Sequence, residues 1–548
     1  MLAVRPKQTL SMVTRDRVRL DADVYIPDGD GPFPVLLMRQ PYGRAIASTV
    51  VYAHPTWYAA HGYIVVIQDV RGRGTSEGEF RLFAHEVEDG AETVAWAANL
   101  PQSTGRVGMY GFSYQGMTQL YAAQANPSAL GAIAPAMVGY HPYSDWAYEN
   151  GALLLQAGAG WAIQLEAETA RRHGDRAAYD ALFRASRHFP AFDPIPAAPE
   201  VLTQYGPTSF WQDWLAHPHA DHYWASLTPN LSHIDLPMLH IGGWFDPYLR
   251  GDLRLYREMV TRSQWPQPLR IGPWGHLPWG RCVGDRDFGP EAESPIDALQ
   301  IRWFDAMLKG DGAWTEPSVE VFEMGRDRWQ SFDQWPATTA QYWHLSSTGL
   351  ASLRASDGRL IPADAQRAPG LDTFVHDPWR PVPAQGGHAA IPAGPCDRTA
   401  IDDRSDVLTY TTPPLITPLH ILGNATVHLT CQADTASFDL CVTLSYVTPA
   451  GRAHLIAQGY GRFQQSAADW QTCTLDLQAT STEVPADHCL RISISAACYP
   501  AYALNLGTGT PDATGRWLDA QITTVSLRHG EPGTAWLRLP ILEPSPHP

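Results

Sequence analysis

With 548 residues, the chain is too long for a single hydrophobic core, so two or three domains are expected. The formal net charge of −17 and the lack of a Lys/Arg cluster argue against a nucleic-acid partner. No run of 18 or more apolar residues occurs, so we expect no membrane-spanning segment. The seven Cys contain no C-x-x-C pair, and residues 1–6 lack an apolar signal core, which together predict free thiols and a cytoplasmic location.

Strands and helices alternate in the first quarter of the chain. Short apolar runs at 34–38, 63–68, 107–110 and 132–137 are typical of strands buried on both faces. Helical patterns at 57–61, 86–99 and 117–126 lie between them. This alternation predicts a doubly wound, mostly parallel sheet, with polar residues of the site at the carboxyl ends of its strands.

A glycine-flanked serine lies between one of these strands and the next helix. Residues 111–116 read Gly-Phe-Ser-Tyr-Gln-Gly, one residue longer than the compact G-x-S-x-G form. Glycines allow the sharp turn that exposes a serine Oγ at the top of a sheet, and the following helix directs its N–H groups to the same place. Taken alone, the motif is equally compatible with an ordinary serine in a glycine-rich turn.

The alternation of strands and helices stops at 140–233, where helical patterns at 151–173 and 177–188 predict a cap inserted into the sheet domain. Strands return at 237–242 and 269–272, followed by a helix at 292–308. After 317, short alternating runs separated by Pro- and Gly-rich turns predict an antiparallel β-sandwich, with 360–400 as a long surface excursion. We therefore expect a catalytic domain at 1–139 and 234–316, a helical cap at 140–233 and a sandwich at 317–548.

Two later strand ends carry the partners that a serine nucleophile requires. Asp246 follows the strand at 237–242 in a Gly-Gly-Trp-Phe-Asp loop, and His276 follows the next strand in a Gly-Pro-Trp-Gly-His loop. A base within hydrogen-bond reach and an acid that orients it would activate Ser113, and the order Ser, Asp, His is that of α/β-hydrolases. Separately, Asp246 could be a helix cap and His276 a packed loop residue, so the joint pattern carries the prediction.

These motifs resemble the serine hydrolase family of cocaine esterase, which also includes X-prolyl dipeptidyl aminopeptidases, α-amino acid ester hydrolases and glutaryl-cephalosporin acylases. Further motifs agree: Pro-Tyr-Gly-Arg at 41–44, Asp-x-Arg-Gly at 69–72, and Trp-Phe-Asp-x-x-Leu-Lys-Gly at 303–310. The resemblance covers nearly the whole chain. It implies an α/β hydrolase core with a helical cap and a jelly-roll-like C-terminal β-sandwich.

The resemblance also implies roles for individual residues. Ser113 corresponds to the nucleophile, Asp246 to the orienting acid and His276 to the general base. The oxyanion hole would take the backbone N–H of Tyr114 and the hydroxyl of Tyr42, although Tyr42 by itself reads as a packing aromatic in a turn.

Substrate contacts are expected from the cap and the acid loop. Trp146 and Trp161 lie where the resembled esterase places pocket aromatics, and Tyr248 follows the acid closely. Carboxylates that could bind a free α-amino group are Asp145, Glu149, Glu166 and Glu168, chosen by location only, and surface solvation is the preferred interpretation of each.

We expect no cofactor and no metal. The cluster His217, His219, Asp221 and His222 mimics a metal site, but its spacing across a proline favours an exposed loop. Asp69 and Arg71 resemble a second acid–base pair, and we expect them instead to brace loops through ion pairs or backbone hydrogen bonds.

The sequence therefore predicts a serine hydrolase that cleaves an ester or amide bond of a small molecule or short peptide through an acyl-enzyme. X-prolyl dipeptidyl-peptidase and carboxylesterase activities remain equal alternatives within it. An acyltransferase or acylase using the same triad, and a binding protein with a silent hydrolase domain, are further alternatives. The oligomeric state is open, a homo-oligomer included.

Overall fold

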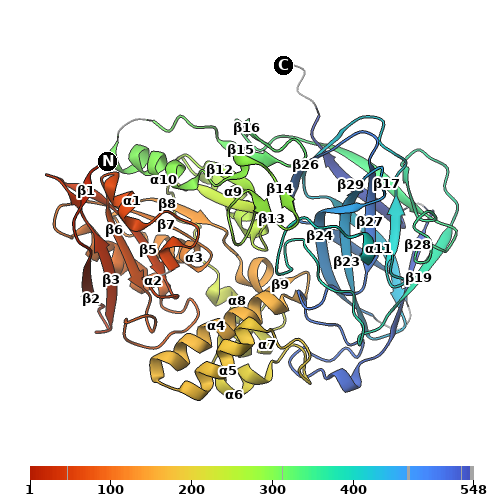
Figure 1. The fold of residues 1–548 in the computed structure, drawn as a ribbon, viewed down its shortest axis with the longest axis horizontal. Coiled ribbons are helices and arrows are strands. Elements are labelled where there is room, and N and C mark those ends of the chain that lie inside the picture. Colours follow the sequence, from red (N-terminus) through yellow and green to blue (C-terminus); the bar gives the residue numbers. More distant parts are fainter. Residues whose placement is uncertain (46, 311–312, 466–468, 532, 544–548) are drawn as a thin grey trace.

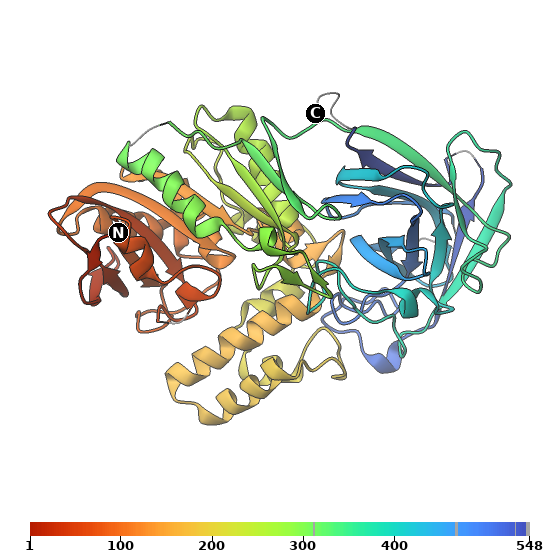
Figure 2. The same ribbon diagram turned by 45° about the horizontal axis from the view of Figure 1, so that its top comes forward.

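The computed structural model describes residues 1–45, 47–310, 313–465, 469–531 and 533–543. A sheet domain with flanking helices, a helical cap and a second β domain lie around a common centre (Figure 1). Figure 2 shows the cap beneath the junction of the sheet domain and the C-terminal β domain.

One ten-stranded sheet organises the first domain, in the order β16-β15-β12-β11-β8-β7-β5-β6-β3-β2. The strands from β6 through β5, β7, β8, β11 and β12 to β15 run parallel, while β2, β3 and β16 are antiparallel to their neighbours. Their bounds are β2 (Gln8–Val13), β3 (Arg19–Tyr25), β5 (Phe33–Gln40), β6 (Ile64–Asp69), β7 (Ser103–Phe112), β8 (Leu130–Ala136), β11 (His240–Phe245), β12 (Leu269–Gly275), β15 (Val319–Glu323) and β16 (Arg328–Phe332).

Helices cover both faces of this sheet, which explains why its strands are apolar on both sides. On one face Val35 and Leu37 of β5 pack in the same core as α2 (Glu86–Ala98) and α3 (Tyr114–Gln124). On the other face Leu36 and Met38 join the core of α1 (Pro55–Ala60) and α10 (Ile296–Phe304). A further helix, α9 (Leu249–Arg262), follows β11. The expected α/β hydrolase fold, a doubly wound and mostly parallel sheet, is confirmed.

The cap lies in the chain between β8 and β11. Its helices are α4 (Leu155–His173), α5 (Arg176–Arg187), α6 (Glu200–Tyr205), α7 (Phe210–Ala216) and α8 (His222–Leu227). Trp211 and Trp214 of α7 are fully buried, and Gly158 of α4 admits them, since a Cβ there would come within 2.6 Å of the Trp211 ring. α4 ends at Gly174, whose φ of 73° is the left-handed conformation that glycine adopts without strain.

The C-terminal domain is a thirteen-stranded, mostly antiparallel sheet that encloses its own core. Its strands are β17 (Thr339–Ser346), β18 (Arg359–Pro362), β19 (Gly370–His376), β20 (Leu408–Thr411), β21 (Leu419–Gly423), β22 (Thr426–Ala433), β23 (Ser437–Val447), β24 (Ala453–Gln464), β25 (Gln471–Asp476), β26 (Thr480–Val484), β27 (Cys489–Ser495), β28 (Thr523–His529) and β29 (Ala535–Ile541). In β22, buried residues alternate strictly with partly exposed ones, as in a strand with one face on a core.

Two expectations about this half of the chain were wrong. Residues 319–324 were expected in the sandwich, but β15 pairs with β12 and β16 with β15, so the first sheet continues past 316. The Val-Glu-Val alternation at 319–321 resembles that of a sandwich strand, although Glu320 is the one residue of β15 that is not buried. The presumed surface excursion at 360–400 includes most of β18 and all of β19, and its residues 386–390 are buried, with His388, Ala389 and Ala390 almost fully enclosed.

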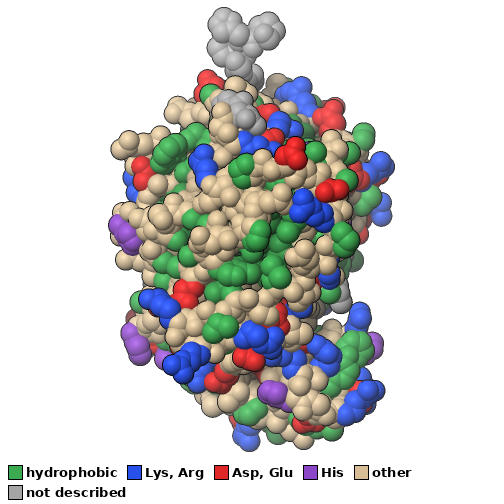
Figure 3. Space-filling view, turned by 90° about the vertical axis from the view of Figure 1, so that its left-hand side faces the viewer, with side chains coloured by type: hydrophobic (Ala, Val, Ile, Leu, Met, Phe, Trp, Pro, Cys, Tyr) green, Lys and Arg blue, Asp and Glu red, His purple; other side chains and the backbone are tan. Residues whose placement is uncertain are grey.

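Surface character gives two further facts. Across the described residues, no helix combines the length and apolar character needed to cross a bilayer. On the face shown in Figure 3, Lys and Arg side chains are interspersed with Asp and Glu rather than gathered into one basic field.

Candidate active site

Ser113 stands at a sharp turn between β7 and α3. Its φ of 60° and ψ of −127° are unusual for a residue with a side chain, and such outliers persist where the surroundings hold them in place. Gly111 has φ 140°, and a Cβ there would meet Gln115 at 2.4 Å. Because Gly116 has no side chain, α3 can pack directly on the end of β8, where a Cβ would come within 2.9 Å of the Ala136 carbonyl oxygen. The glycines thus shape the elbow that lifts Ser113.

The structure brings Ser113, His276 and Asp246 together from three strand ends. His276 Nε2 lies 3.0 Å from Ser113 Oγ, and His276 Nδ1 lies 3.0 Å from Asp246 Oδ2. The backbone N–H of Tyr248 donates to the other oxygen of Asp246 at 2.6 Å, and the carboxylate is fully buried. Gln478 of the C-terminal domain donates to the Asp246 carbonyl at 2.8 Å. The imidazole is therefore held between an acid and a hydroxyl, the arrangement that activates a serine.

Two groups beside Ser113 can donate to an oxyanion. Desolvation raises the pKa of Tyr42 to about 12, opposed by interactions with Trp161 and Ser113, so the phenol keeps its proton at neutral pH. Tyr114 opens α3, and its own hydroxyl points away to Glu86 at 2.7 Å. Its backbone N–H, rather than its side chain, is the group available at the helix N-terminus.

A cavity of about 550 Å³ opens over Ser113. Trp146, Trp161 and Tyr248 all line it, as do Tyr42 and His276. Trp146, in η2 (Pro142–Ala147), stacks on Trp161 of α4 with ring centroids 5.4 Å apart and contacts Tyr248 at 4.6 Å. Tyr248 in turn meets the His276 ring edge-on at 5.0 Å. Aromatic packing therefore runs from the cap to the triad, and no Asp, Glu, Lys or Arg is among the described lining residues.

Sequence reasoning missed the wall that the C-terminal domain supplies. Residues 388–393 (His-Ala-Ala-Ile-Pro-Ala) line the same cavity. His388 Nε2 lies 2.8 Å from the buried Glu149 Oε2, which also accepts from Tyr502 at 2.6 Å and Arg250 at 2.9 Å. Burial opposes ionisation of Glu149, but Arg250 and His388 outweigh it and hold the pKa of this carboxyl well below its usual range. The Gly-Gly pair before His388, followed by small apolar residues, was the available signal.

The cap carboxylates considered for an α-amino group are engaged elsewhere or lie outside the cavity lining. Asp145 accepts two hydrogen bonds from Arg254, each 3.0 Å long, and Glu168 pairs with Arg171. Burial raises the pKa of Glu166, which is also absent from the lining.

The other sequence motifs form structural contacts. Asp69 pairs with Arg44 and Arg71 with Asp89, so both brace loops as expected. His217 Nδ1 lies 2.6 Å from Asp221, which caps α8.

One group of ligand-type side chains does converge within the described ranges: Glu323, His420 and Glu483. Arg326 pairs with both carboxylates and Arg328 approaches Glu323, so the negative charge there is already balanced. Burial raises the pKa of Glu323 to about 6.

The fold and the strand-end Ser–His–Asp cluster define an α/β-hydrolase-type serine hydrolase. Residues 16–278 match the model of the X-Pro dipeptidyl-peptidase (S15) family, and 312–533 match the X-Pro dipeptidyl-peptidase C-terminal non-catalytic domain. Cocaine esterase from Rhodococcus sp. is 30% identical over 96% of this chain and 97% of its own. The chain thus belongs to the serine hydrolase family of cocaine esterase and the S15 peptidases, and it acts on ester or amide bonds.

Solved structures agree on the fold. An aminopeptidase from a marine-sediment Thaumarchaeota archaeon superposes with a TM-score of 0.81 at 22% identity, covering 98% of this chain and 96% of that one. An α-amino acid ester hydrolase gives 0.80 at 20% identity, covering 98% and 96%. At such identities these neighbours establish architecture rather than substrate.

Proposed function

We propose that the chain is a carboxylesterase for esters with an uncharged, largely apolar acyl group. In this proposal Ser113 Oγ attacks the ester carbonyl while His276 Nε2 takes its proton, and Asp246 orients and stabilises the imidazolium. The Ser113 to His276 to Asp246 contacts of 3.0 Å each, opening onto a cavity lined by aromatic rings and by no described Asp, Glu, Lys or Arg, are the observation that carries the proposal.

Tyr42 and the Tyr114 backbone N–H would stabilise the oxyanion of the tetrahedral intermediate. A phenol whose pKa is about 12 stays protonated at neutral pH and can donate a hydrogen bond to the oxyanion. The alcohol leaves with the proton from His276. His276 then takes a proton from a water molecule that attacks the acyl-enzyme, and it returns this proton to Ser113 Oγ as the acid is released. Removing one donor of this kind typically lowers kcat about 10²- to 10³-fold.

The cavity favours an ester over an X-Pro peptide. A peptidase that removes a dipeptide must hold a free α-ammonium group, and that charge requires a carboxylate within reach. The described lining has none, and the carboxylates Asp145 and Glu149 are already paired with arginines. Val50, Leu277 and Ile391 are solvent-exposed while lining the cavity, so apolar surface continues outward for the leaving group.

Two measurements test the proposal. A fluorophosphonate probe should label the wild type and leave Ser113→Ala unlabelled. On a substrate panel, p-nitrophenyl esters should exceed X-Pro and X-Ala anilides in kcat/KM by at least about 10²-fold. Efficient release of an X-Pro dipeptide would assign the chain to the peptidases instead.

A further inference from the structure

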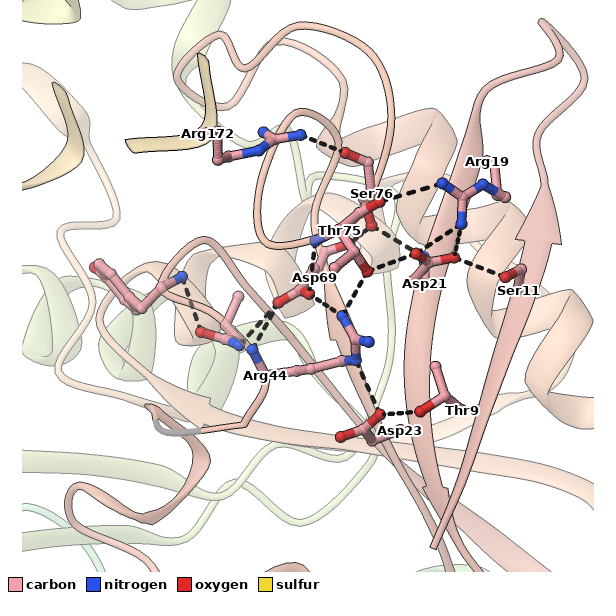
Figure 4. Close-up of polar contacts among 12 residues, drawn as sticks. Thr9, Ser11, Arg19, Asp21, Asp23, Arg44, Asp69, Thr75, Ser76 and Arg172 are labelled. Carbon is pink, nitrogen blue, oxygen red and sulfur yellow. Dashed lines mark hydrogen bonds and ion pairs between the residues drawn. The ribbon is translucent and has the colours of Figure 1, made fainter. Parts of the chain in front are cut away.

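Asp69, a fully buried carboxylate outside the triad, lies at the carboxyl end of β6. It accepts from the side chain of Arg44 at 2.5 Å and from the backbone N–H of Arg44 at 2.7 Å. Figure 4 shows Asp69 and Asp23 on either side of the Arg44 guanidinium, with Thr75 also in contact. Burying a charge is costly, and desolvation raises the pKa of Asp69 against the opposing effect of Arg44.

The contacts of Asp69 converge on the short loop that carries Tyr42. At the start of the loop, the fully buried Gln40 donates to Asp69 Oδ1 at 3.4 Å, and its own Oε1 accepts the backbone N–H of Tyr42 at 2.9 Å. At the end of the loop, the same Oδ1 accepts the Arg44 N–H. One carboxylate oxygen of Asp69 therefore holds both ends of the turn. Tyr42, in the middle of this turn, has its hydroxyl beside Ser113.

The chain is also shaped to leave room for this carboxylate. Gly74 has φ 53°, and a Cβ at that position would lie 1.9 Å from Asp69 Oδ2. The backbone of the next loop therefore packs directly against the acid, and Thr75 N–H approaches Oδ2 at 3.4 Å. With loops closed on two sides, Asp69 has little freedom to move.

We propose that Asp69 is a positioning residue for the oxyanion hole, acting through Gln40 and the Arg44 backbone to fix the Tyr42 hydroxyl relative to Ser113. The inference rests on the role of Tyr42 in the proposed function. An oxyanion donor is effective only when it is held in place before charge develops. A more mobile Tyr42 would therefore reduce stabilisation of the transition state more than binding of the substrate.

Asp69→Asn, Tyr42→Phe and their double variant test this coupling on p-nitrophenyl ester hydrolysis. Asp69→Asn should lower kcat at least about tenfold with KM within about twofold, because the amide turns a donor toward Arg44. In the Tyr42→Phe background, Asp69→Asn should lower kcat by less than about threefold further, since the positioned hydroxyl is already gone. Phenylboronic acid, which forms a tetrahedral adduct with serine, should bind more weakly to both single variants.

Asp23→Asn is the matched control. Asp23 is also buried and pairs with Arg44 Nε at 2.9 Å, but it makes no hydrogen bond with the backbone of the Tyr42 loop. Its kcat should stay within about twofold of wild type. If Asp69→Asn fails to fold, Gln40→Met breaks the same relay and should show the same coupling to Tyr42→Phe.

The outcomes separate the two proposals. An unchanged rate in Tyr42→Phe removes Tyr42 from the oxyanion hole and overturns the inference with it. If Tyr42→Phe is slow, two results would overturn the inference and leave the proposed esterase mechanism standing. One is a kcat loss in the double variant equal to the product of the two single losses. The other is an Asp69→Asn rate equal to that of Asp23→Asn.

Discussion

Asp246→Asn tests the acid of the proposed triad with the smallest change of shape. The buried carboxylate faces two groups, the Tyr248 N–H at 2.6 Å and His276 Nδ1 at 3.0 Å. An asparagine has one acceptor oxygen, and the Tyr248 N–H requires it, so the amide NH₂ is turned toward His276. A donor at that position selects the tautomer with bare Nδ1 and protonated Nε2, which cannot accept the proton of Ser113.

The expected magnitude follows from that tautomer exchange. In serine proteases the same substitution lowers kcat about 10⁴-fold, which corresponds to about 5.4 kcal/mol of lost transition-state stabilisation. Here the loss should fall on kcat with KM nearly unchanged, because Asp246 is fully buried behind the imidazole and is not among the residues lining the cavity. Steady-state hydrolysis of a p-nitrophenyl ester measures both quantities.

Asp252 offers a matched control. It is equally buried, its Oδ1 accepts the Val138 N–H at 2.8 Å, and no described residue hydrogen-bonds to its Oδ2. Burial first, and then the charge of Asp246, raise its pKa well above its ordinary value, and an asparagine in its place keeps an Oδ1 acceptor for the Val138 N–H. Asp252→Asn should therefore keep kcat within about twofold. Equal losses in Asp246→Asn and Asp252→Asn, or a loss below tenfold at Asp246, would refute the assignment.

Three other predictions concern the surroundings of the triad. Gln478→Ala removes two hydrogen bonds to the acid loop and should lower kcat about tenfold; a change only in melting temperature would contradict a role for the C-terminal domain in holding Asp246. Glu149→Gln leaves Arg250 uncompensated and should cost about 3 kcal/mol of unfolding free energy at pH 7 by urea denaturation. Since its folded pKa is depressed, that contribution is present above the ordinary value of 4.5 and is lost as pH falls, so an equal gap at acid pH would refute it. Ala390→Phe narrows the cavity and should raise KM for p-nitrophenyl benzoate at least about tenfold while sparing the acetate; equal effects on both esters would place Ala390 outside the acyl site.

The fold and the triad cluster were accessible from sequence because they depend on local patterns. Ser113, Asp246 and His276 each follow a buried apolar run, and parallel strands present their carboxyl ends at one rim. The sheet order and the pairing of β15 with β12 were not accessible, since the Val-Glu-Val alternation at 319–321 is equally compatible with a strand of either sheet. Periodicity reports which face of a strand is covered, and it does not identify the neighbouring strand.

The wall formed by residues 388–393 lay beyond sequence reasoning for a different cause. Its buried part, residues 388–390, is fixed by contacts of His388 with Glu149, 239 residues away in the chain, and with Tyr502, 114 residues further on. In the sequence, Glu149 alone reads as a solvated carboxylate of the cap. Where these residues meet, the carboxylate of Glu149 is buried away from water, and the start of the segment at 388–393 is buried beside it.

This division between local and distant determinants bears on how the site can change. The nucleophile elbow and the loops of Asp246 and His276 arise within the sheet domain, where most alterations would disturb strand packing. The acyl wall is instead shared by the cap, through Trp146 and Trp161, and by the C-terminal segment at 388–393. Substitutions in that wall can alter the acyl group accepted without touching the proton relay. In the proposed function, acyl preference thus depends largely on segments outside the proton relay, and Glu149, which contacts Arg250 of α9 and His388, connects those segments with the helix that follows Asp246.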